Sequence, residues 1–370
     1  MNETELVFAE NSPYDSLEAV IEQDDDVAYF YLRPTGKQKY DMKSCWIRNF
    51  CKAPETFDKE RMKQGLAPIL PERFCKFPDG QPKLIESELR IVWFESGDGA
   101  ALMHGDEFLS VIPPWSGTQI GENNLELSGY ARDCIGVSPL CIELSDPRAI
   151  NQRIASADQY WSSWETDDSP WLLEEPKLFA AYEKAFGTHS KYYAIDNGQW
   201  PPKAIVRFDC DDRIIFMTLG VSLCPQPQAE LYFENPNTVR RIELGCSFSK
   251  DVPEPTLAAF LGYLSGQVAM PWQQLTFLAS GHTITCDLFL KTDHLPDFSS
   301  ILLWNQNQLP DSSQVVSIPD VMGEEVNLLW TIPLFENERQ MASQLGSAAI
   351  AGKILKSQGL PIIDNRSIAV

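Results

Sequence analysis

Short runs of apolar residues, each ended by a turn-forming residue, dominate the pattern of this chain. Runs of about four to eight residues that are rich in β-branched and aromatic side chains, and that are bounded by Gly, Pro, Asp or Asn, are typical of strands. This pattern predicts strands at residues 27–32, 88–94, 107–112, 203–208, 213–219, 229–233, 239–244, 283–290, 299–303, 314–318 and 326–331.

Helical spacing follows the start signal Ser145-Asp-Pro147, a capping side chain before a proline in the first turn. The apolar residues that come next recur at steps of three and four, which places them on one face of a helix. We interpret its tryptophans as core residues. The stripe consists of Ile150, Ile154, Ala157, Trp161 and Trp164. Further helices are expected at 256–268 and 336–356, and a short one at 177–186.

The order of these elements bears on the fold class and on the number of domains. Strands and helices do not alternate as they do in βαβ units, so we expect an α+β fold with mixed or antiparallel sheets and packed helices. The 370 residues exceed what one ordinary core supports. Residues 166–203 are rich in acids, glycine and proline, as domain connections are. We predict domains at 1–195 and 196–345, followed by a helix end and tail at 346–370.

Charge is distributed unevenly along the chain. The 52 acidic and 30 basic residues give a net charge of −22, which argues against nucleic acid or an anionic membrane as a partner. Residues 1–26 hold nine acids and no base, whereas residues 33–90 hold 13 bases and 8 acids, so we expect these two stretches to form ion pairs. Residues 91–199 carry 17 acids and 6 bases, which makes them the expected surface for a basic partner.

Signatures of catalysis are missing from the sequence. It has no G-x-S-x-G elbow, no phosphate-binding P-loop and no G-x-G-x-x-G. His282 in Ser280-Gly-His-Thr-Ile284 could serve as a base or ligand, but a role in holding the turn is the favoured interpretation. The nine cysteines show no C-x-x-C spacing, which favours reduced thiols in the cores. Without a signal-like start or a run long enough to span a bilayer, we expect a cytoplasmic protein.

Three residues on turn-rich segments are candidates for partner binding. Trp115 lies in Ile112-Pro-Pro-Trp-Ser-Gly117, and Tyr130 and Arg132 lie in Ser128-Gly-Tyr-Ala-Arg-Asp-Cys134. Trp, Tyr and Arg on loops are the residue types that anchor interfaces. Burial under a long loop is the alternative for the two aromatic residues.

The second half of the chain resembles the suppressor of fused domain, from about residue 205 to 345. The resemblance lies in the order and spacing of four motifs, which are Thr218-Leu-Gly-Val-Ser222, Leu278-Ala-Ser-Gly-His-Thr-Ile284, the 299–303 strand, and Val326-Asn-Leu-Leu-Trp-Thr-Ile-Pro333 with the Glu336 and Glu338 that follow it. The first half is similar to the N-terminal region of longer bacterial members, in Trp46-Ile-Arg-Asn49, Leu89-Arg-Ile-Val-Trp-Phe-Glu95, Gly97-Asp-Gly-Ala-Ala101 and the two segments that hold Trp115 and Tyr130.

The resemblance implies a protein-binding function. Animal members hold a partner segment between two α/β domains, and bacterial members are associated with the neutralisation of toxins. It therefore implies a non-enzymatic immunity protein that binds a toxin domain directly, with no cofactor and no metal, and a structural role for Gly281, His282 and Thr283. The alternatives are a hydrolase or transferase centred on His282, and a general adaptor that holds a partner peptide between domains.

Overall fold

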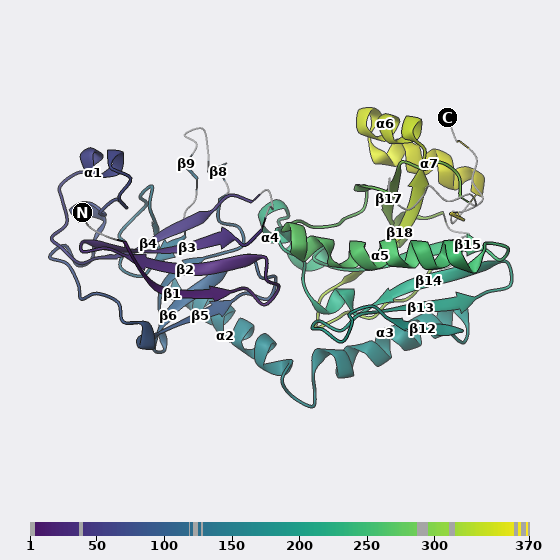
Figure 1. The fold of residues 1–370 in the computed structure, drawn as a ribbon, viewed down its shortest axis with the longest axis horizontal. Coiled ribbons are helices and arrows are strands. Elements are labelled where there is room, and N and C mark those ends of the chain that lie inside the picture. Colours follow the sequence, from purple (N-terminus) through teal and green to yellow (C-terminus); the bar gives the residue numbers. More distant parts are fainter. Residues whose placement is uncertain are drawn as a thin grey trace. The chain divides into compact units, whose positions relative to one another are not determined.

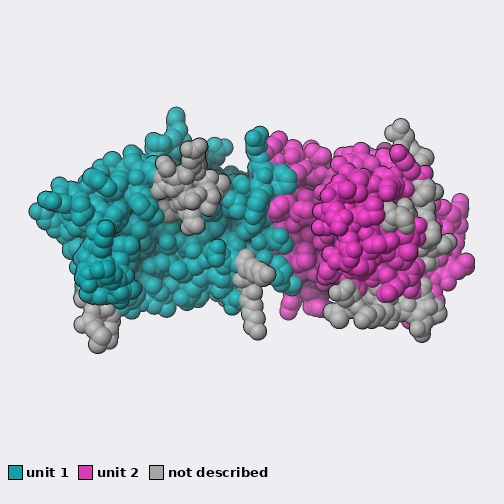
Figure 2. Space-filling view, turned by 90° about the horizontal axis from the view of Figure 1, so that it is seen from above, with its two compact units in different colours: residues 1–162, 227–234, 272–276 teal, residues 163–226, 235–271, 277–370 magenta. Residues whose placement is uncertain are grey.

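The computed structural model describes residues 4–36, 40–117, 119–120, 125–126, 129–286, 295–310, 315–358, 362–363 and 368. The chain forms two compact units, which are coloured separately in Figure 2. Unit 1 comprises residues 1–162, 227–234 and 272–276, and unit 2 comprises residues 163–226, 235–271 and 277–370.

The first sheet of unit 1 is an antiparallel meander in the order β1-β2-β3-β4 (Figure 1). Two of its strands lie in the acidic start of the chain, where no strand was predicted. Leu17, Ala19 and Ile21 are buried on one face of β2, while the more exposed Glu18 and Glu22 share the other face with the buried Val20, and this explains how such a charged stretch forms a strand. The strands are β1 (Glu5–Asn11), β2 (Leu17–Gln23), β3 (Val27–Pro34) and β4 (Lys43–Asn49).

The second sheet of unit 1 has the strand order β11-β10-β7-β6-β5 within the described residues. Trp93 and Leu102 on one face pack into the same core as the first sheet. Val92 and Ala101 on the other face pack against helix α2 (Pro147–Ser163). The strands are β5 (Leu89–Trp93), β6 (Ala100–His104), β7 (Glu107–Ile112), β10 (Tyr130–Ala131) and β11 (Ile142–Glu143).

Smaller elements complete unit 1. They include helix α4, which belongs to this unit although it lies far along the chain. These elements are α1 (Lys59–Lys63), the two-residue strands β8 (Gln119–Ile120) and β9 (Leu125–Glu126), α4 (Ala229–Tyr232), and 3-10 turns at Glu72–Phe74 and Glu86–Glu88.

Unit 2 is built on a mixed sheet in the order β12-β13-β14-β15-β18-β17-β16, in which β15 and β18 are parallel. The strands are β12 (Lys191–Ala194), β13 (Ala204–Asp209), β14 (Arg213–Leu219), β15 (Arg241–Ser249), β16 (Thr283–Thr285), β17 (Ser300–Asn305) and β18 (Val326–Leu334). The 3-10 turns are at Val221–Leu223, Pro236–Thr238 and Gln306–Gln308.

Helices cover both faces of this sheet. Tyr182 of α3 (Pro170–Phe186) packs in one core with Trp330 of β18. On the other face, Phe260 of α5 (Glu254–Gln274) meets Phe248 of β15 with their ring centroids 4.9 Å apart. The last two helices, α6 (Glu336–Leu345) and α7 (Ser347–Gln358), pack on residues of β17 and β18.

The α+β architecture with mixed and antiparallel sheets confirms the predicted fold class. The helices predicted from Pro147 and at 256–268 are confirmed as α2 and as part of α5, and the one predicted at 177–186 begins earlier, at Pro170. The predicted domain division at residues 195 and 345 stays a prediction.

Four predicted elements are wrong, only partly right or only partly described. Residues 229–232 form helix α4 instead of a strand, because contacts from distant residues override the strand preference of its aromatic residues. The helix predicted at 336–356 is divided at Gly346, whose φ of 89° does not continue an α-helix. Residues 315–318 form no strand, residue 314 lies outside the described residues, and of the strand predicted at 283–290 only residues 283–286 are described.

Candidate functional site

A pocket in unit 1 brings together two of the three predicted partner-binding residues. We call it the α2 pocket, and its volume is about 520 Å³. Its walls are the turn after β7, the first residue of β10, the segment before α2 and the first turns of α2 itself. The lining residues are Trp115, Tyr130, Glu143, Leu144, Ser145, Asp146, Ala149, Ile150, Gln152, Arg153 and Ser156.

Local backbone geometry places the two aromatic residues. Trp115 lies in a tight turn closed by a hydrogen bond from Ser116 N to Pro113 O at 3.0 Å. Tyr130 pairs with Val111 of β7, and the chain reaches that strand through Gly129. A Cβ atom at Gly129 would lie 2.3 Å from Val111 O, so only glycine allows this close approach.

The third candidate, Arg132, lies outside the α2 pocket. Its guanidinium group pairs with Glu107 at 2.8 Å and with Asp133 at 3.0 Å. These carboxylates raise the pKa of Arg132 and neutralise its charge locally. Within the described residues, the structure therefore assigns Arg132 to an intramolecular ion-pair network.

The basic residue of the α2 pocket is Arg153, which none of the sequence motifs contains. Its guanidinium group pairs with Glu230 of α4 at 2.5 Å and with Glu95 at 3.2 Å, and lies 5.0 Å from the ring centroid of Phe94. Burial lowers the pKa of Arg153, but the two carboxylates outweigh it and raise the pKa overall. Arg153 is four residues before Ala157, so it lies on the same face of the helix as the apolar stripe. A charged residue on a buried face needs a partner of opposite charge, and its position in the sequence therefore indicated a buried ion pair.

Lys43 supports the turn that carries Trp115, and the buried Asp98 is the opposite charge that interacts with it electrostatically. Lys43 of β4 donates a hydrogen bond to Pro114 O at 3.2 Å and lies 5.1 Å from the ring centroid of Tyr40. Asp98 is fully buried and accepts hydrogen bonds from Ser96 Oγ and Gln228 N, both at 2.6 Å. Burial lowers the pKa of Lys43 to about 8, an effect that Asp98 opposes.

This lowered pKa predicts a pH-dependent stability. The Lys43 amine holds its proton less tightly in the folded protein than in the unfolded chain, where its pKa is about 10.4. The free energy of unfolding should therefore rise between pH 8 and about pH 10, by at most about 1.4 kcal/mol per pH unit. Urea unfolding of the wild type and of Lys43→Met across this range measures the effect as a difference in slope. Equal slopes for the two proteins would contradict it.

The family motif at Thr218–Ser222 of unit 2 encloses a buried carboxylate. Glu243 of β15 is fully buried and accepts hydrogen bonds from Thr218 Oγ1 at 2.6 Å and from the backbone N–H groups of Gly220 and Ser222, both at 3.0 Å. The Ser222 hydroxyl donates a fourth hydrogen bond at 2.7 Å. Burial raises the pKa of Glu243, and these donors oppose that shift. The motif thus has a structural explanation.

The motif around His282 is joined to β17 by backbone hydrogen bonds. Gly281 N donates to Leu303 O at 2.8 Å, and Leu303 N donates to His282 O at 2.9 Å. The Ser347 hydroxyl donates to Gly281 O at 2.6 Å, and Thr283 begins β16. The ring of His282 packs beside Phe277 with the ring centroids 5.1 Å apart, and partial burial lowers its pKa. These contacts describe how the motif is held, and the structural role predicted for Gly281, His282 and Thr283 stays a prediction.

Neither a metal site nor a membrane span is found in the described part of the chain. Its residues include no group of three or more His, Cys, Asp or Glu side chains that could hold a metal ion. None of its helices combines the length and the apolar character needed to cross a membrane.

Comparison with known proteins finds a family likeness in the second half of the chain. Residues 199–366 match the family model of the Suppressor of fused protein (SUFU). The chain is therefore a protein with a SUFU-like domain, which confirms the resemblance inferred from the motifs of its second half. The matched residues include 227–234 and 272–276, which belong to unit 1. No curated protein sequence matches the chain.

Two solved structures are among those similar to the chain. The structure titled "the Sufu-Fu complex crystal structure" has 14% sequence identity and a TM-score of 0.37, over 53% of this chain and 93% of that one. The crystal structure of Drosophila Suppressor of Fused has 11% identity and a TM-score of 0.36, over 53% of this chain and 51% of that one.

Proposed function

We propose that this protein is a non-enzymatic protein-binding module that engages its partner through the α2 pocket. The observation that carries the proposal is the meeting of Trp115 and Tyr130 in one pocket beside the carboxylate of Glu143. Aromatic residues that line a recess anchor protein interfaces, and carboxylates at its edge favour a basic partner. The SUFU-like domain supports a binding role.

In its specific form, the proposal is that the partner is a toxin domain that the protein neutralises by direct binding. This form is supported by the resemblance of the chain to immunity proteins and by its net charge of −22, which would accelerate the capture of a basic domain. The test is co-expression with a toxin domain sought among the products of the neighbouring genes. We expect restored growth of the host and a stable complex on gel filtration. Continued toxicity without a complex would overturn the toxin proposal.

Truncating the central aromatic residue of the α2 pocket should weaken the complex strongly. For Trp115→Ala we expect a dissociation constant at least about 30-fold higher, because interface anchors of this kind contribute about 2 kcal/mol or more. Titration calorimetry with the purified partner measures the change. Phe77→Ala is the matched control, since Phe77 is a half-exposed aromatic residue of the same unit that does not line the α2 pocket. Equal losses for the two variants would show that binding does not depend on this pocket.

A further inference from the structure

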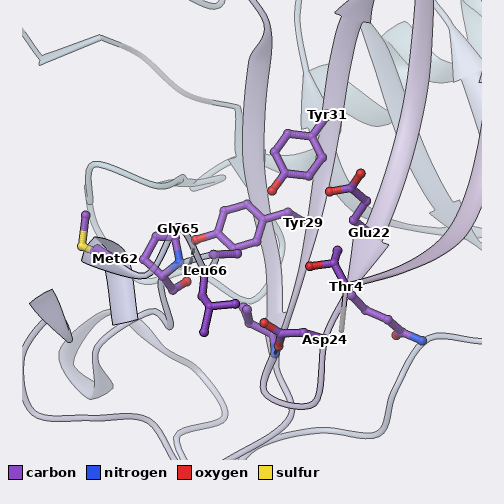
Figure 3. Close-up of a pocket in the computed structure, with 12 residues that line it drawn as sticks. Thr4, Glu22, Asp24, Tyr29, Tyr31, Met62, Gly65 and Leu66 are labelled. Carbon is purple, nitrogen blue, oxygen red and sulfur yellow. Dashed lines mark hydrogen bonds between the residues drawn. The ribbon is translucent and has the colours of Figure 1, made fainter. Parts of the chain in front are cut away.

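A second pocket of unit 1 lies between the first sheet and the loop that follows α1 (Figure 3). We call it the tyrosine pocket, and its volume is about 360 Å³. It shares no lining residue with the α2 pocket, and strands β2 and β3 form its floor. The lining residues are Thr4, Glu22, Gln23, Asp24, Val27, Tyr29, Tyr31, Met62, Gly65, Leu66, Ala67 and Pro68.

The loop wall of the tyrosine pocket is held in place by buried hydrogen bonds. Arg61 of α1 donates to Ala67 O at 2.6 Å and to Asp26 at 2.7 Å, and it also pairs with the buried Asp24. The Tyr29 hydroxyl donates to Pro68 O at 2.7 Å. The recess is thus formed before any ligand arrives, which reduces the entropy lost on binding.

Two aromatic rings form one side of the recess. Tyr29 and Tyr31 are two residues apart on β3, so their side chains share a face of the sheet. Their ring centroids are 5.9 Å apart and the ring planes are inclined by 21°. Burial raises the pKa of Tyr31 to about 12, with a smaller contribution from the nearby Glu22 and Asp24. Burial raises the pKa of Tyr29 as well, so both rings are neutral at physiological pH. Tyr29 is only 4% exposed, so the electron-rich face in the recess is that of the half-buried Tyr31.

The carboxylate of Glu22 gives the pocket its charge. Glu22 of β2 is directly opposite Tyr29 in the strand register, and Figure 3 shows its carboxylate on the side of Tyr31. Nearby Asp24 and Asp26 are paired with Arg61, and Asp25 is paired with Lys83 at 2.9 Å. Among the described residues, no hydrogen-bond donor or cation contacts the Glu22 carboxylate.

We propose that the tyrosine pocket binds an arginine side chain of the protein partner. A guanidinium group is flat enough to stack on the Tyr31 ring and presents two parallel N–H groups to the Glu22 carboxylate, which the compact ammonium group of lysine does not. The same carboxylate disfavours an anionic ligand. This inference rests on the proposed function, because it takes the arginine to belong to the protein partner. Whether the pocket binds an arginine side chain at all can be tested without that partner.

The test uses short peptides as probes for the full-length protein. Acetyl-Gly-Arg-Gly-amide is compared with the lysine peptide and with the citrulline peptide, which keeps the shape of arginine but has no charge. We expect protein-observed NMR titrations to show binding of the arginine peptide in the millimolar range, shifts in the signals of Tyr29 and Tyr31, and at least about tenfold weaker binding of the other two peptides.

Variants locate the binding and separate this inference from the proposed function. Glu22→Gln should raise the dissociation constant of the arginine peptide at least about tenfold. Glu18→Gln on the same strand, whose carboxylate pairs with Arg33 at 2.8 Å, should leave its binding unchanged. Equal binding of the arginine and citrulline peptides, or binding that Glu22→Gln does not change, would overturn the inference. The proposed function would still stand if Trp115→Ala weakened the complex with the partner.

Discussion

Replacing Glu243 with alanine is expected to lower the free energy of unfolding of unit 2 by about 4 kcal/mol. The substitution removes the acceptor of four hydrogen bonds inside a fully buried site. The donors of Thr218, Gly220 and Ser222 would then be left without an acceptor, and each such buried group costs about 1–3 kcal/mol. The cost of the vacated volume adds to this loss.

Hydrogen exchange followed by mass spectrometry can assign this effect to unit 2. Peptides that cover residues 213–224 and 241–249 should exchange much faster in Glu243→Ala, because their protection depends on the stability of this sheet. The matched control is Glu254→Ala, which removes an exposed carboxylate that pairs with Arg207 and Lys191 and should cost less than about 1 kcal/mol. A loss below 1 kcal/mol for Glu243→Ala would contradict the structural role of the Thr218–Ser222 motif.

The second large effect is expected at Arg153, which lines the α2 pocket and also forms a buried ion-pair cluster. Arg153→Met keeps most of the side-chain volume but leaves the carboxylates of Glu95 and Glu230 close together and largely buried. Removing one partner from such a buried ion pair costs about 3–5 kcal/mol. Because the Arg153 side chain is 22% exposed, we expect about 2–4 kcal/mol from urea unfolding.

A double-mutant cycle tests whether the ion pair itself is responsible. Glu230→Gln should recover part of the stability lost in Arg153→Met, because it removes one of the two unpaired carboxylates. Arg148→Met is the matched control on the same helix, since the Arg148 side chain is 89% exposed and pairs with the exposed Asp146. We expect less than about 0.5 kcal/mol for this control. A similar loss for Arg148→Met and Arg153→Met would contradict the role of the buried cluster.

The sequence predicted those elements whose patterns depend on neighbouring residues. The stripe after Pro147 and the apolar positions from Leu257 to Leu264 give helices because each repeat meets the core at the expected spacing. Residues 229–233 behave differently. Their Leu, Tyr and Phe favour a strand, but Glu230 pairs with Arg153, and Gln228 N donates to Asp98, a residue 130 positions earlier. No local pattern contains such a contact.

The same distinction holds for the α2 pocket. Trp115 and Tyr130 could be chosen from residue type and turn-rich surroundings, because large aromatic residues in such segments stand out locally. The charges of Lys43, Asp98 and Arg153 could not be connected from the sequence, since their partners come from the turn after β7 and from the distant residues 228–230. Long-range pairing of this kind depends on the fold.

The interleaving of the two units limits how this protein could be divided or recombined. The chain passes between them five times, since residues 227–234 and 272–276 return to unit 1 from within the SUFU-like sequence. In unit 1, Trp272 stacks on Tyr14 at a centroid distance of 5.7 Å, and Leu275 is buried in the core. A gene fragment that encodes only residues 199–366 would leave both side chains without these neighbours. Its product would expose these apolar side chains to solvent and would tend to aggregate. Exchange of this domain between genes by recombination is therefore expected to succeed only when the N-terminal sheets are inherited with it.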